Sequence, residues 1–246
     1  MAYLFNSLSL FLPCYNEEAN LESTVSKTLP ILIKIAKNWE LIIVNDGSGD
    51  KTGAVAFKIQ KTYPQNIKIV THSLNRGYGA AFKSGFYAAK CDWIALIDAD
   101  GQFDFNDIYK LQAVQKESKA DVVIGYYLGR KVPFYRIWGS KLWQLVVFLL
   151  FGLKVRDIDC GFKLVRKKVI DTIPELVAER GPFISSEFLI KAKKAGFKIM
   201  ESGVSHYPRT AGEATGAKLS VVLAGFKDLF RLWFKLNFSS WKNTGP

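Results

Sequence analysis

Cysteine and histidine are scarce in this sequence, which leaves little material for thiol chemistry or for a metal site built on these residues. The chain has three cysteines and two histidines in 246 residues. The cysteines are widely spaced and form no metal-ligand pattern. Cys160 has no histidine nearby in sequence, and neither His72 nor His206 lies in a context typical of a catalytic dyad. We therefore expect buried thiols, as in a reducing cytoplasm, and no cysteine nucleophile.

Long apolar runs, internal repeats and targeting signals are also missing. The uncharged run 142–153 is shorter than the roughly 20 apolar residues that a membrane-spanning helix needs. The start, Met1-Ala2-Tyr3, has no basic flank, and no small-residue cleavage site follows it, so we expect no secretory signal peptide. No repeat or low-complexity tract is evident.

The balance of charge is strongly positive, with a formal net charge of +12. Such a charge requires a negative partner, and nucleic acid, nucleotide phosphates and an anionic membrane leaflet all qualify. The basic residues are spread among apolar segments without a recognisable nucleic-acid-binding module, so we expect no nucleic-acid partner. The length and the 49% hydrophobic content indicate a single globular domain over residues 1–246.

Strand and helix patterns alternate through the first half of the chain. Short apolar runs bounded by turn residues predict strands at residues 9–13, 41–44, 67–71, 94–97 and 121–125. The segments between them predict helices at about 20–36, 52–63, 79–89 and 105–116. This order is typical of an α/β fold with a mostly parallel central sheet flanked by helices.

Two carboxylates follow the predicted strand 94–97, with one residue between them. Side chains two apart in an extended backbone point to the same side, so Asp98 and Asp100 can share a hard divalent cation such as Mg²⁺ or Mn²⁺. In open α/β sheets, ligands bind at the carboxyl ends of the strands. An isolated Asp-x-Asp is also compatible with a solvated turn. Polar clusters after strands 9–13 and 41–44, at the same predicted edge, favour the binding interpretation.

The second half of the chain contains two amphipathic segments. Residues 135–153 are very apolar with cations at their edges, and residues 219–238 carry Lys227, Arg231 and Lys235 at every fourth position. A basic stripe beside aliphatic and aromatic side chains is typical of a helix that lies on a membrane surface. The alternative is a terminal helix docked on the domain, with its lysines merely solvated.

Three motifs stand in order along the chain, each directly after a predicted strand: Leu12-Pro13-Cys14-Tyr15-Asn16-Glu17, Val44-Asn45-Asp46-Gly47-Ser48 and Asp98-Ala99-Asp100-Gly101-Gln102. With them the chain resembles the family 2 glycosyltransferases, and most of all the branch that contains dolichyl-phosphate mannosyltransferases and glucosyltransferases, over residues 9–218. The resemblance implies a single GT-A-type nucleotide-sugar transferase domain. It implies a nucleotide- and metal-binding half (about 5–130), an acceptor half (131–216) and a C-terminal amphipathic helix (217–246).

The resemblance assigns the donor side of the site to side chains at the strand ends. Asp46 matches the aspartate that hydrogen-bonds the nucleotide base, although an Asx-type turn alone would also explain it. Asp98, Asp100 and Gln102 match the metal triad, which places Mg²⁺ or Mn²⁺ against the donor diphosphate and assists its departure. The other donor contacts that the resemblance implies are Pro13, Tyr15 beside the base, Glu17 near the ribose, and Arg76 at phosphate or sugar.

A lipid-phosphate site is implied at the start of the first amphipathic segment. Arg136 and Ser140, one helical turn apart, match the pair that holds a lipid phosphate in the family, and Arg130 is a candidate second arginine. An ordinary first turn of a helix is the alternative interpretation of this pair.

Three further matches complete the acceptor half. Glu187 resembles an acidic residue that orients a sugar hydroxyl or structures the site. Arg209 lies in a segment that resembles the loop closing over the diphosphate, and would be its cation. Residues 157–163 resemble a segment that reads Ser-Gly-Phe-Arg in the mannosyltransferases, with Cys160 in place of the serine.

Together these matches imply inverting transfer of a hexose from a UDP- or GDP-sugar to a polyprenyl or dolichyl phosphate. The protein would be peripheral, on the cytoplasmic face of a membrane with an anionic surface. Because a phosphate monoester is already anionic, such an acceptor needs positioning and charge shielding rather than a general base. Two alternatives stay open: a family 2 transferase that acts on a sugar or lipid hydroxyl, with Glu187 or Asp159 as base, and a non-catalytic nucleotide-sugar-binding membrane protein.

Overall fold

The computed structural model describes residues 3–129, 134–179, 181, 183–209 and 219–238. Within them a seven-stranded sheet has the strand order β3-β2-β1-β4-β6-β5-β7. The strands are β1 (Phe5–Cys14), β2 (Ala36–Asn45), β3 (Ile67–Thr71), β4 (Trp93–Leu96), β5 (Val122–Leu128), β6 (Lys163–Arg166) and β7 (Ile199–Ser205). β6 is antiparallel to both of its neighbours, and the other pairs are parallel. The sheet is therefore mostly parallel, as the sequence predicts, with one reversed strand inside it.

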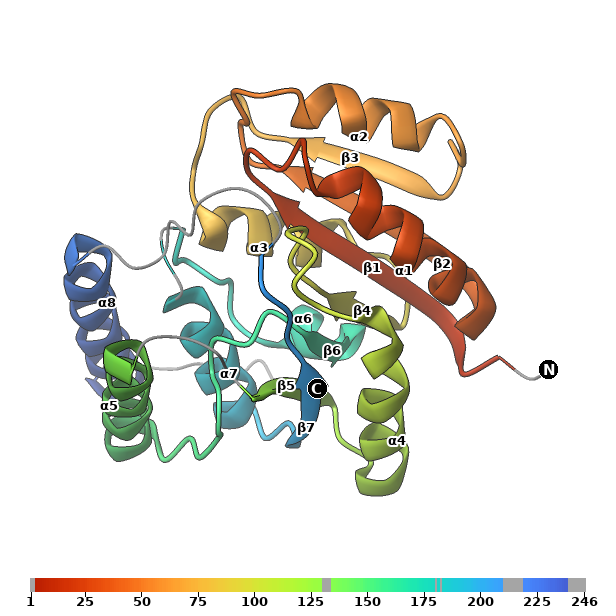
Figure 1. Ribbon diagram of the computed structural model, residues 1–246. Helices are drawn as coiled ribbons and strands as arrows, with labels where there is room; N and C mark the ends of the chain where they lie inside the picture. The colour runs from red at the N-terminus through yellow and green to blue at the C-terminus, as the bar shows by residue number, and fades with distance from the viewer. Residues whose placement is uncertain (1–2, 130–133, 180, 182, 210–218, 239–246) are drawn as a thin grey trace.

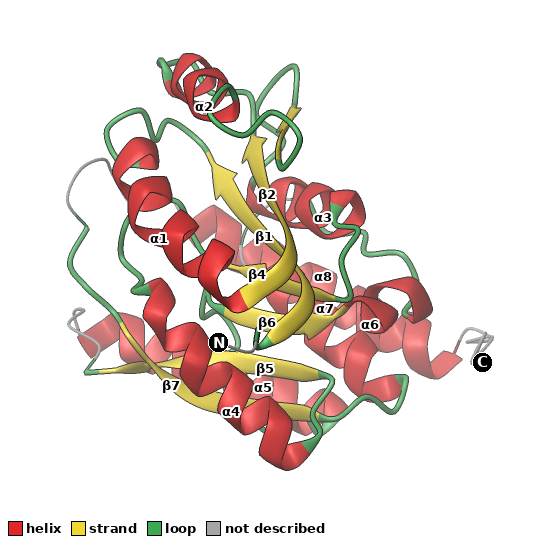
Figure 2. Cartoon of the chain, turned by 90° about the vertical axis from the view of Figure 1, so that its right-hand side faces the viewer, coloured by secondary structure: helices red, strands yellow, loops and turns green. Residues whose placement is uncertain are grey.

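Helices cover both faces of the sheet, which gives three layers (Figures 1 and 2). One face carries α1 (Leu21–Ile35), α2 (Thr52–Gln60), the short 3-10 turn η1 (Phe105–Asp107) and α4 (Ile108–Ser118). The other carries α3 (Tyr78–Ala88), α6 (Lys167–Thr172), α7 (Phe183–Lys194) and α8 (Leu219–Phe238), and α5 (Phe134–Phe151) contributes Val147 to the same core. The predicted α/β architecture is confirmed.

Strand β1 contributes side chains to the hydrophobic core on each face of the sheet. Its side chains alternate between the two faces, so Leu10 and Leu12 pack under α1 whereas Phe11 packs toward α3. Phe11 makes edge-on contacts with two phenylalanines of that helix. A Cβ at Gly85 would lie 2.1 Å from the Phe11 ring, so only glycine permits α3 to approach this closely.

Strands β6 and β7 are not predicted by the sequence patterns. β6 has only four residues and begins with the buried Lys163. β7 contains Glu201, Ser202 and Gly203, which interrupt the apolar alternation expected of a strand. Because β6 is reversed, its first residue pairs with Leu96 at the end of β4. The pairing therefore brings Lys163 close to the predicted metal ligands.

Helices α5 and α8 lie side by side and pack against each other through Trp143 and Phe226 (Figure 1). The α8 side chains Leu229, Leu232 and Leu236 are buried in the core. Its cations Lys227, Arg231 and Lys235 are exposed. The helix is thus docked on the domain and keeps its basic stripe on the surface, so the two sequence interpretations are compatible. None of the helices in the described ranges has the length and apolar character needed to cross a membrane.

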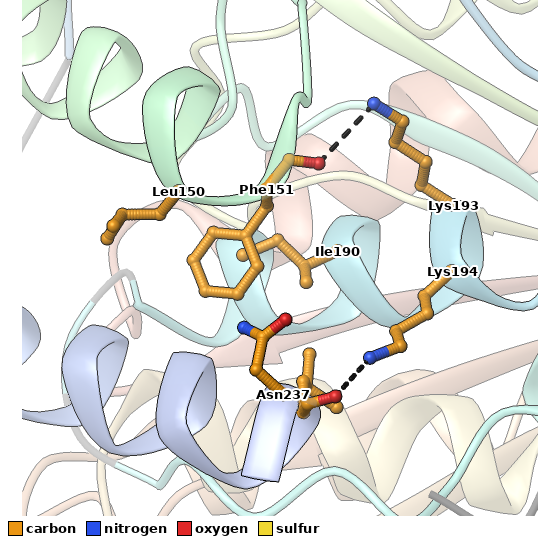
Figure 3. A pocket seen from close by; sticks show the side chains of 7 residues that line it. Leu150, Phe151, Ile190, Lys193, Lys194 and Asn237 are labelled. Carbon is orange, nitrogen blue, oxygen red and sulfur yellow. Dashed lines mark hydrogen bonds between the residues drawn. The ribbon is translucent and has the colours of Figure 1, made fainter.

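Two lysines at the end of α7 hold the ends of α5 and α8 (Figure 3). Lys193 donates to the carbonyl oxygens of Phe151 and Gly152, and Lys194 donates to that of Leu236. The last carbonyls of a helix have no partner within it and carry partial negative charge, so a lysine is a suitable cap. Between these contacts is a small open pocket, lined mainly by Leu150, Phe151, Ile190 and Leu236.

Candidate active site

The polar turns after β1, β2 and β4 meet at one edge of the sheet. β1 pairs in parallel with both β2 and β4, so the carboxyl ends of the three strands are adjacent. The first two turns are joined directly, because Gly49 N donates to Asn16 Oδ1 (2.9 Å) and Glu17 N donates to Thr52 Oγ1 (2.8 Å). The edge predicted from the sequence is therefore the edge where the candidate residues of the donor side gather.

Asp46, predicted to bind the nucleotide base, is 2% exposed and holds the loop that precedes α3. Its Oδ1 accepts from Arg76 N (3.0 Å) and contacts His72 Nδ1 (2.5 Å). Its Oδ2 accepts from Gly77 N (2.8 Å) and Asn75 Nδ2 (3.0 Å). A carboxylate offers about four acceptor positions, and all are engaged. A base N–H could bind Asp46 only in exchange for one of these donors.

The ring of His72 bridges Asp46 and Ser84, with Nε2 2.9 Å from Ser84 Oγ. Ser84 lies on α3, twelve positions further along the chain, so the tertiary fold and not proximity in sequence brings this serine to the ring. The bridge fastens the loop of Asp46 to α3.

Asp98 and Asp100 lie together after β4 and are largely buried. Burial, and then the charge of Asp100, raise the pKa of Asp98 to about 7. Burial also raises the pKa of Asp100, against the lowering effects of the Gln102 backbone N–H and of Arg209. Two neighbouring, largely buried carboxylates form a favourable site for a divalent cation, which would neutralise both. The raised pKa of each carboxyl fits the metal role that the sequence predicts.

The cation would need ligands beyond these two carboxylates. In the described part of the chain, no group of three or more His, Cys, Asp or Glu side chains is arranged to hold a metal ion. The amide nitrogen of Gln102 donates to Tyr207 O (2.9 Å), so only its amide oxygen is suited to a metal. Oxygens of a donor diphosphate and water are the natural source of the remaining ligands.

Three further residues, not predicted from the sequence to lie there, surround Asp98. Tyr78 donates its hydroxyl to Asp98 Oδ1 (3.2 Å). Gly161 lies so close that a Cβ would be 2.1 Å from Asp98 Oδ2, so this position requires glycine. Lys163 is fully buried, donates to Cys160 O and to Ser185 Oγ (3.3 Å), and its charge lowers the pKa of Asp98. The only local sign of Lys163 in the sequence is its position directly before the apolar residues Leu164 and Val165.

The cysteine beside this lysine is a buried thiol, as predicted. Cys160 is fully buried, and burial raises its pKa to about 12. A thiol with such a pKa is protonated at neutral pH and is a poor nucleophile.

Arg209, predicted to face the diphosphate, is brought to the same edge of the sheet. It donates to Glu17 Oε1 through Nη2, and its Nη1 lies 3.8 Å from Asp100 Oδ2. Glu17, predicted near the ribose, is mostly buried and accepts from Arg209 and from Asn20 Nδ2 (2.7 Å). Tyr15 is 41% exposed and therefore accessible to a base.

Arg76, predicted at phosphate or sugar, pairs with Glu179 in this structure. Both side chains are between 41% and 46% exposed, so the pair is solvated and weak enough for a ligand to replace. Pro13 is buried within β1 and shapes the end of that strand.

Glu187 is fully buried on α7, away from solvent. Its carboxylate accepts from Val177 N (3.0 Å) and Ala178 N (2.8 Å), and from Lys191 Nζ (2.5 Å). The same segment contacts α3, because Ala80 N donates to Glu179 O (3.0 Å). Of the two roles expected for Glu187, this geometry favours structuring the site over contact with a sugar hydroxyl.

The structure describes the candidates for lipid-phosphate binding only in part. Arg136 and Ser140 fall in the first two turns of α5, as predicted. The side chain of Arg136 and the whole of Arg130 lie outside the described residues. Their roles remain predictions.

Comparisons with known proteins give matches over most of the chain. A family model described as glycosyl transferase family 2 matches residues 9–173. A dolichyl-phosphate beta-glucosyltransferase of Trichomonas vaginalis is 29% identical over 251 residues, which covers 96% of this chain and 75% of that protein. The Homo sapiens dolichyl-phosphate beta-glucosyltransferase is 32% identical over 196 residues, covering 72% of this chain and 60% of that protein. Dodecaprenyl-phosphate galacturonate synthase of Rhizobium johnstonii is 29% identical, covering 83% of this chain and 60% of that protein.

Solved structures share the fold. Glucosyl-3-phosphoglycerate synthase from Mycobacterium tuberculosis, in complex with Mn²⁺, UDP and glucosyl-3-phosphoglycerate, superposes with a TM-score of 0.70 at 18% identity. The match covers 94% of this chain and 79% of the other. The same enzyme with Mn²⁺ and UDP-glucose gives a TM-score of 0.69 at 17% identity, over 94% of this chain and 78% of the other. At this identity the likeness concerns the arrangement of helices and strands.

Proposed function

Because this chain belongs to glycosyl transferase family 2 and is therefore a glycosyltransferase, we propose that it moves a hexose from a nucleoside-diphosphate sugar to a polyprenyl phosphate. The observation that carries the proposal is the largely buried pair Asp98 and Asp100, with the Arg209 guanidinium beside it, at the joined ends of β1, β2 and β4. Relatives named for transfer to dolichyl or dodecaprenyl phosphate support the acceptor class.

A divalent cation, Mg²⁺ or Mn²⁺, would supply Lewis-acid assistance to the departing nucleoside diphosphate. Asp98 and Asp100 would hold this cation, with the Gln102 amide oxygen as a further ligand. The Arg209 guanidinium would shield the negative charge of the diphosphate. Gly161 and Tyr78 keep the Asp98 carboxylate in place, because one leaves no room behind it and the other donates to it. The preorganised charges therefore stabilise the leaving group without a moving proton.

The contacts of Glu187 support a phosphate acceptor over a hydroxyl acceptor. A hydroxyl acceptor needs a general base, and Glu187 is occupied by two backbone N–H groups and Lys191. A phosphate acceptor is already anionic and needs cations instead. Arg136 and Ser140 at the start of α5 are the residues we assign to it. The hydroxyl alternative would have to use another base, such as Asp159.

UDP-glucose is the donor that we propose to test first. Relatives named as glucosyltransferases and the UDP complexes of the structural neighbour favour it over a GDP-sugar. The base would lie against the exposed Tyr15 and the loop that Asp46 holds.

We further propose that α5 and α8 rest on the anionic, cytoplasmic face of a membrane. Along α5, Trp138, Leu142, Leu145 and Leu149 are between 51% and 70% exposed and recur with helical spacing, which makes one apolar stripe. On α8, Phe230 and Phe234 are exposed beside the stripe of Lys227, Arg231 and Lys235. An apolar surface bordered by cations suits the boundary between acyl chains and anionic headgroups. The protein would be peripheral there.

The test is a transfer assay with the full chain, Mn²⁺ or Mg²⁺, and radiolabelled UDP-glucose or GDP-mannose. The acceptors are a short polyprenyl phosphate, the matching polyprenol and diacylglycerol. We expect an organic-soluble, labelled product from the polyprenyl phosphate alone, and none from Asp100→Asn. Equal transfer to polyprenol or diacylglycerol would favour the hydroxyl alternative. Binding of the sugar nucleotide without transfer to any acceptor would favour the non-catalytic one.

A further inference from the structure

Arg209 joins the segment after β7 to the turns after β1 and β4. Its guanidinium donates to Glu17 Oε1 and reaches within 3.8 Å of Asp100 Oδ2. The backbone beside it is fixed to the metal turn, because Tyr207 N donates to Gln102 O (2.8 Å) and the Gln102 side chain donates to Tyr207 O (2.9 Å). The arginine therefore points into the carboxylate cluster from an anchored position.

Glu17, which accepts from Arg209, is itself held in place by hydrogen bonds. The residue is 7% exposed, and its second oxygen accepts from Asn20 Nδ2 (2.7 Å). Its own backbone N–H is bound by Thr52 Oγ1 (2.8 Å). A carboxylate restrained in this way limits the orientations of the guanidinium that donates to it, because the charge-assisted hydrogen bond forms only with Nη2 facing Glu17 Oε1.

Asp100 has limited room for a second cation. Its Oδ1 accepts from Gln102 N (3.1 Å), and its Oδ2 faces the Arg209 guanidinium. A divalent cation that binds Asp100 would meet the positive charge of Arg209 at the same oxygen. The two cations repel each other, so each weakens the binding of the other.

We propose that Glu17 is a positioning residue that holds Arg209 against Asp100, and that Arg209 and the divalent cation compete for Asp100. Cation binding then shifts Arg209 from Asp100 toward the donor diphosphate. This inference rests on the proposed function, because it takes Asp98 and Asp100 as the metal ligands. Arg209 then weakens the binding of the cation when no nucleotide is bound, and strengthens the binding of the nucleotide once the cation is in place.

The experiment measures two affinities of Arg209→Gln in the full chain. The dissociation constant for Mn²⁺ alone, from the resonance signal of free Mn²⁺, should fall about twofold to fivefold, the size of one partly exposed charge pair. The dissociation constant for UDP at saturating Mn²⁺ should rise by about tenfold or more. Arg166→Gln removes the same charge from the pair with Asp121, outside the carboxylate cluster, and should change neither value. Arg209→Lys keeps the charge and should leave Mn²⁺ affinity near that of the wild type.

Glu17 is tested by a double-mutant cycle with the same measurement of UDP affinity. If Glu17 acts through Arg209, the effect of Glu17→Gln in the wild-type background should differ at least threefold from its effect in Arg209→Gln. A purely structural role would give the same effect in both backgrounds and would overturn the assignment.

The outcomes separate this inference from the function on which it rests. Mn²⁺ affinity that stays the same or weakens in Arg209→Gln overturns the competition, while the metal site stands. Wild-type protein that binds no Mn²⁺, with or without UDP, overturns the metal site itself. Opposite signs of the two changes in Arg209→Gln support the proposal, since general destabilisation would weaken both affinities.

Discussion

Asp98→Asn should make the protein more stable at alkaline pH while it abolishes transfer. A carboxyl whose pKa is raised from 3.8 to about 7 by burial and by Asp100 is ionised at pH 8 at a cost of about 4 kcal/mol relative to the unfolded chain. Between these two values the folded state binds more protons than the unfolded state. The free energy of unfolding therefore falls as the pH rises through this window. Asparagine does not ionise, so the variant should not lose this stability.

The assay is urea unfolding of wild type and Asp98→Asn in EDTA, at pH 4.5 and pH 8. We expect the variant to be more stable by about 2–4 kcal/mol at pH 8, where Asp98 is ionised, and to differ much less at pH 4.5. Mn²⁺ should raise the stability of the wild type and not that of the variant, because only a native state with its ligands binds the cation. Asp171→Asn, at an exposed pair with Lys167, is the control and should follow the wild type. A variant that is no more stable than the wild type at pH 8 would refute the reasoning.

The remaining predictions concern the acceptor half and the membrane surface. Glu187→Gln should lower the free energy of unfolding by about 3 kcal/mol, because it leaves Lys191 and a backbone N–H without their buried carboxylate; an unchanged urea midpoint would contradict this. Arg136→Ala should remove about 2–4 kcal/mol of transition-state stabilisation and so lower the rate of transfer to polyprenyl phosphate. The affinity for UDP-glucose, measured by calorimetry, should stay near that of the wild type. Loss of donor affinity instead would move the phosphate site elsewhere. Replacing the exposed α8 cations Lys227, Arg231 and Lys235 by glutamine should weaken co-sedimentation with anionic liposomes. Added salt should weaken it too, since the Debye length falls from about 10 Å at 0.1 M to about 3 Å at 1 M. Binding that is unchanged by both would exclude an electrostatic contribution.

The strands and helices of the first half could be predicted because local pattern and tertiary environment agree there. The run at 67–71 is rich in β-branched residues, is bounded by turn residues, and forms β3 within the same limits. The C-terminal helix has the predicted bounds 219–238 because its leucines repeat at helical spacing. β6 and β7 escaped prediction because they contain buried or interrupting polar residues, such as Lys163, whose partners include Ser185, 22 positions away.

In the candidate site, the sequence predicted which residues take part but not which partners they bind. The position of the polar motifs after strands predicted that Asp98 and Asp100 share a site, and the resemblance to family 2 glycosyltransferases added Asp46 and Arg209 to it. The parallel pairing of β1 with its neighbours gathers the three strand ends. Their hydrogen-bond partners could not be predicted, because those partners are set by contacts between segments far apart in the chain. Arg209 meets Glu17 across 192 positions, which no local pattern encodes.

The sequence by itself determined the alternation of strands and helices, the carboxylates at the strand ends and the basic stripe of α8, because each depends on residues only a few positions apart. The tertiary structure alone decided which of these groups are engaged. It saturates Asp46 with donors from the loop before α3, buries Glu187 under Val177 and Ala178, and places Arg209 between Glu17 and Asp100. The physical reason is that burial and the low dielectric of the interior give a charged group its properties through whichever neighbours the fold provides.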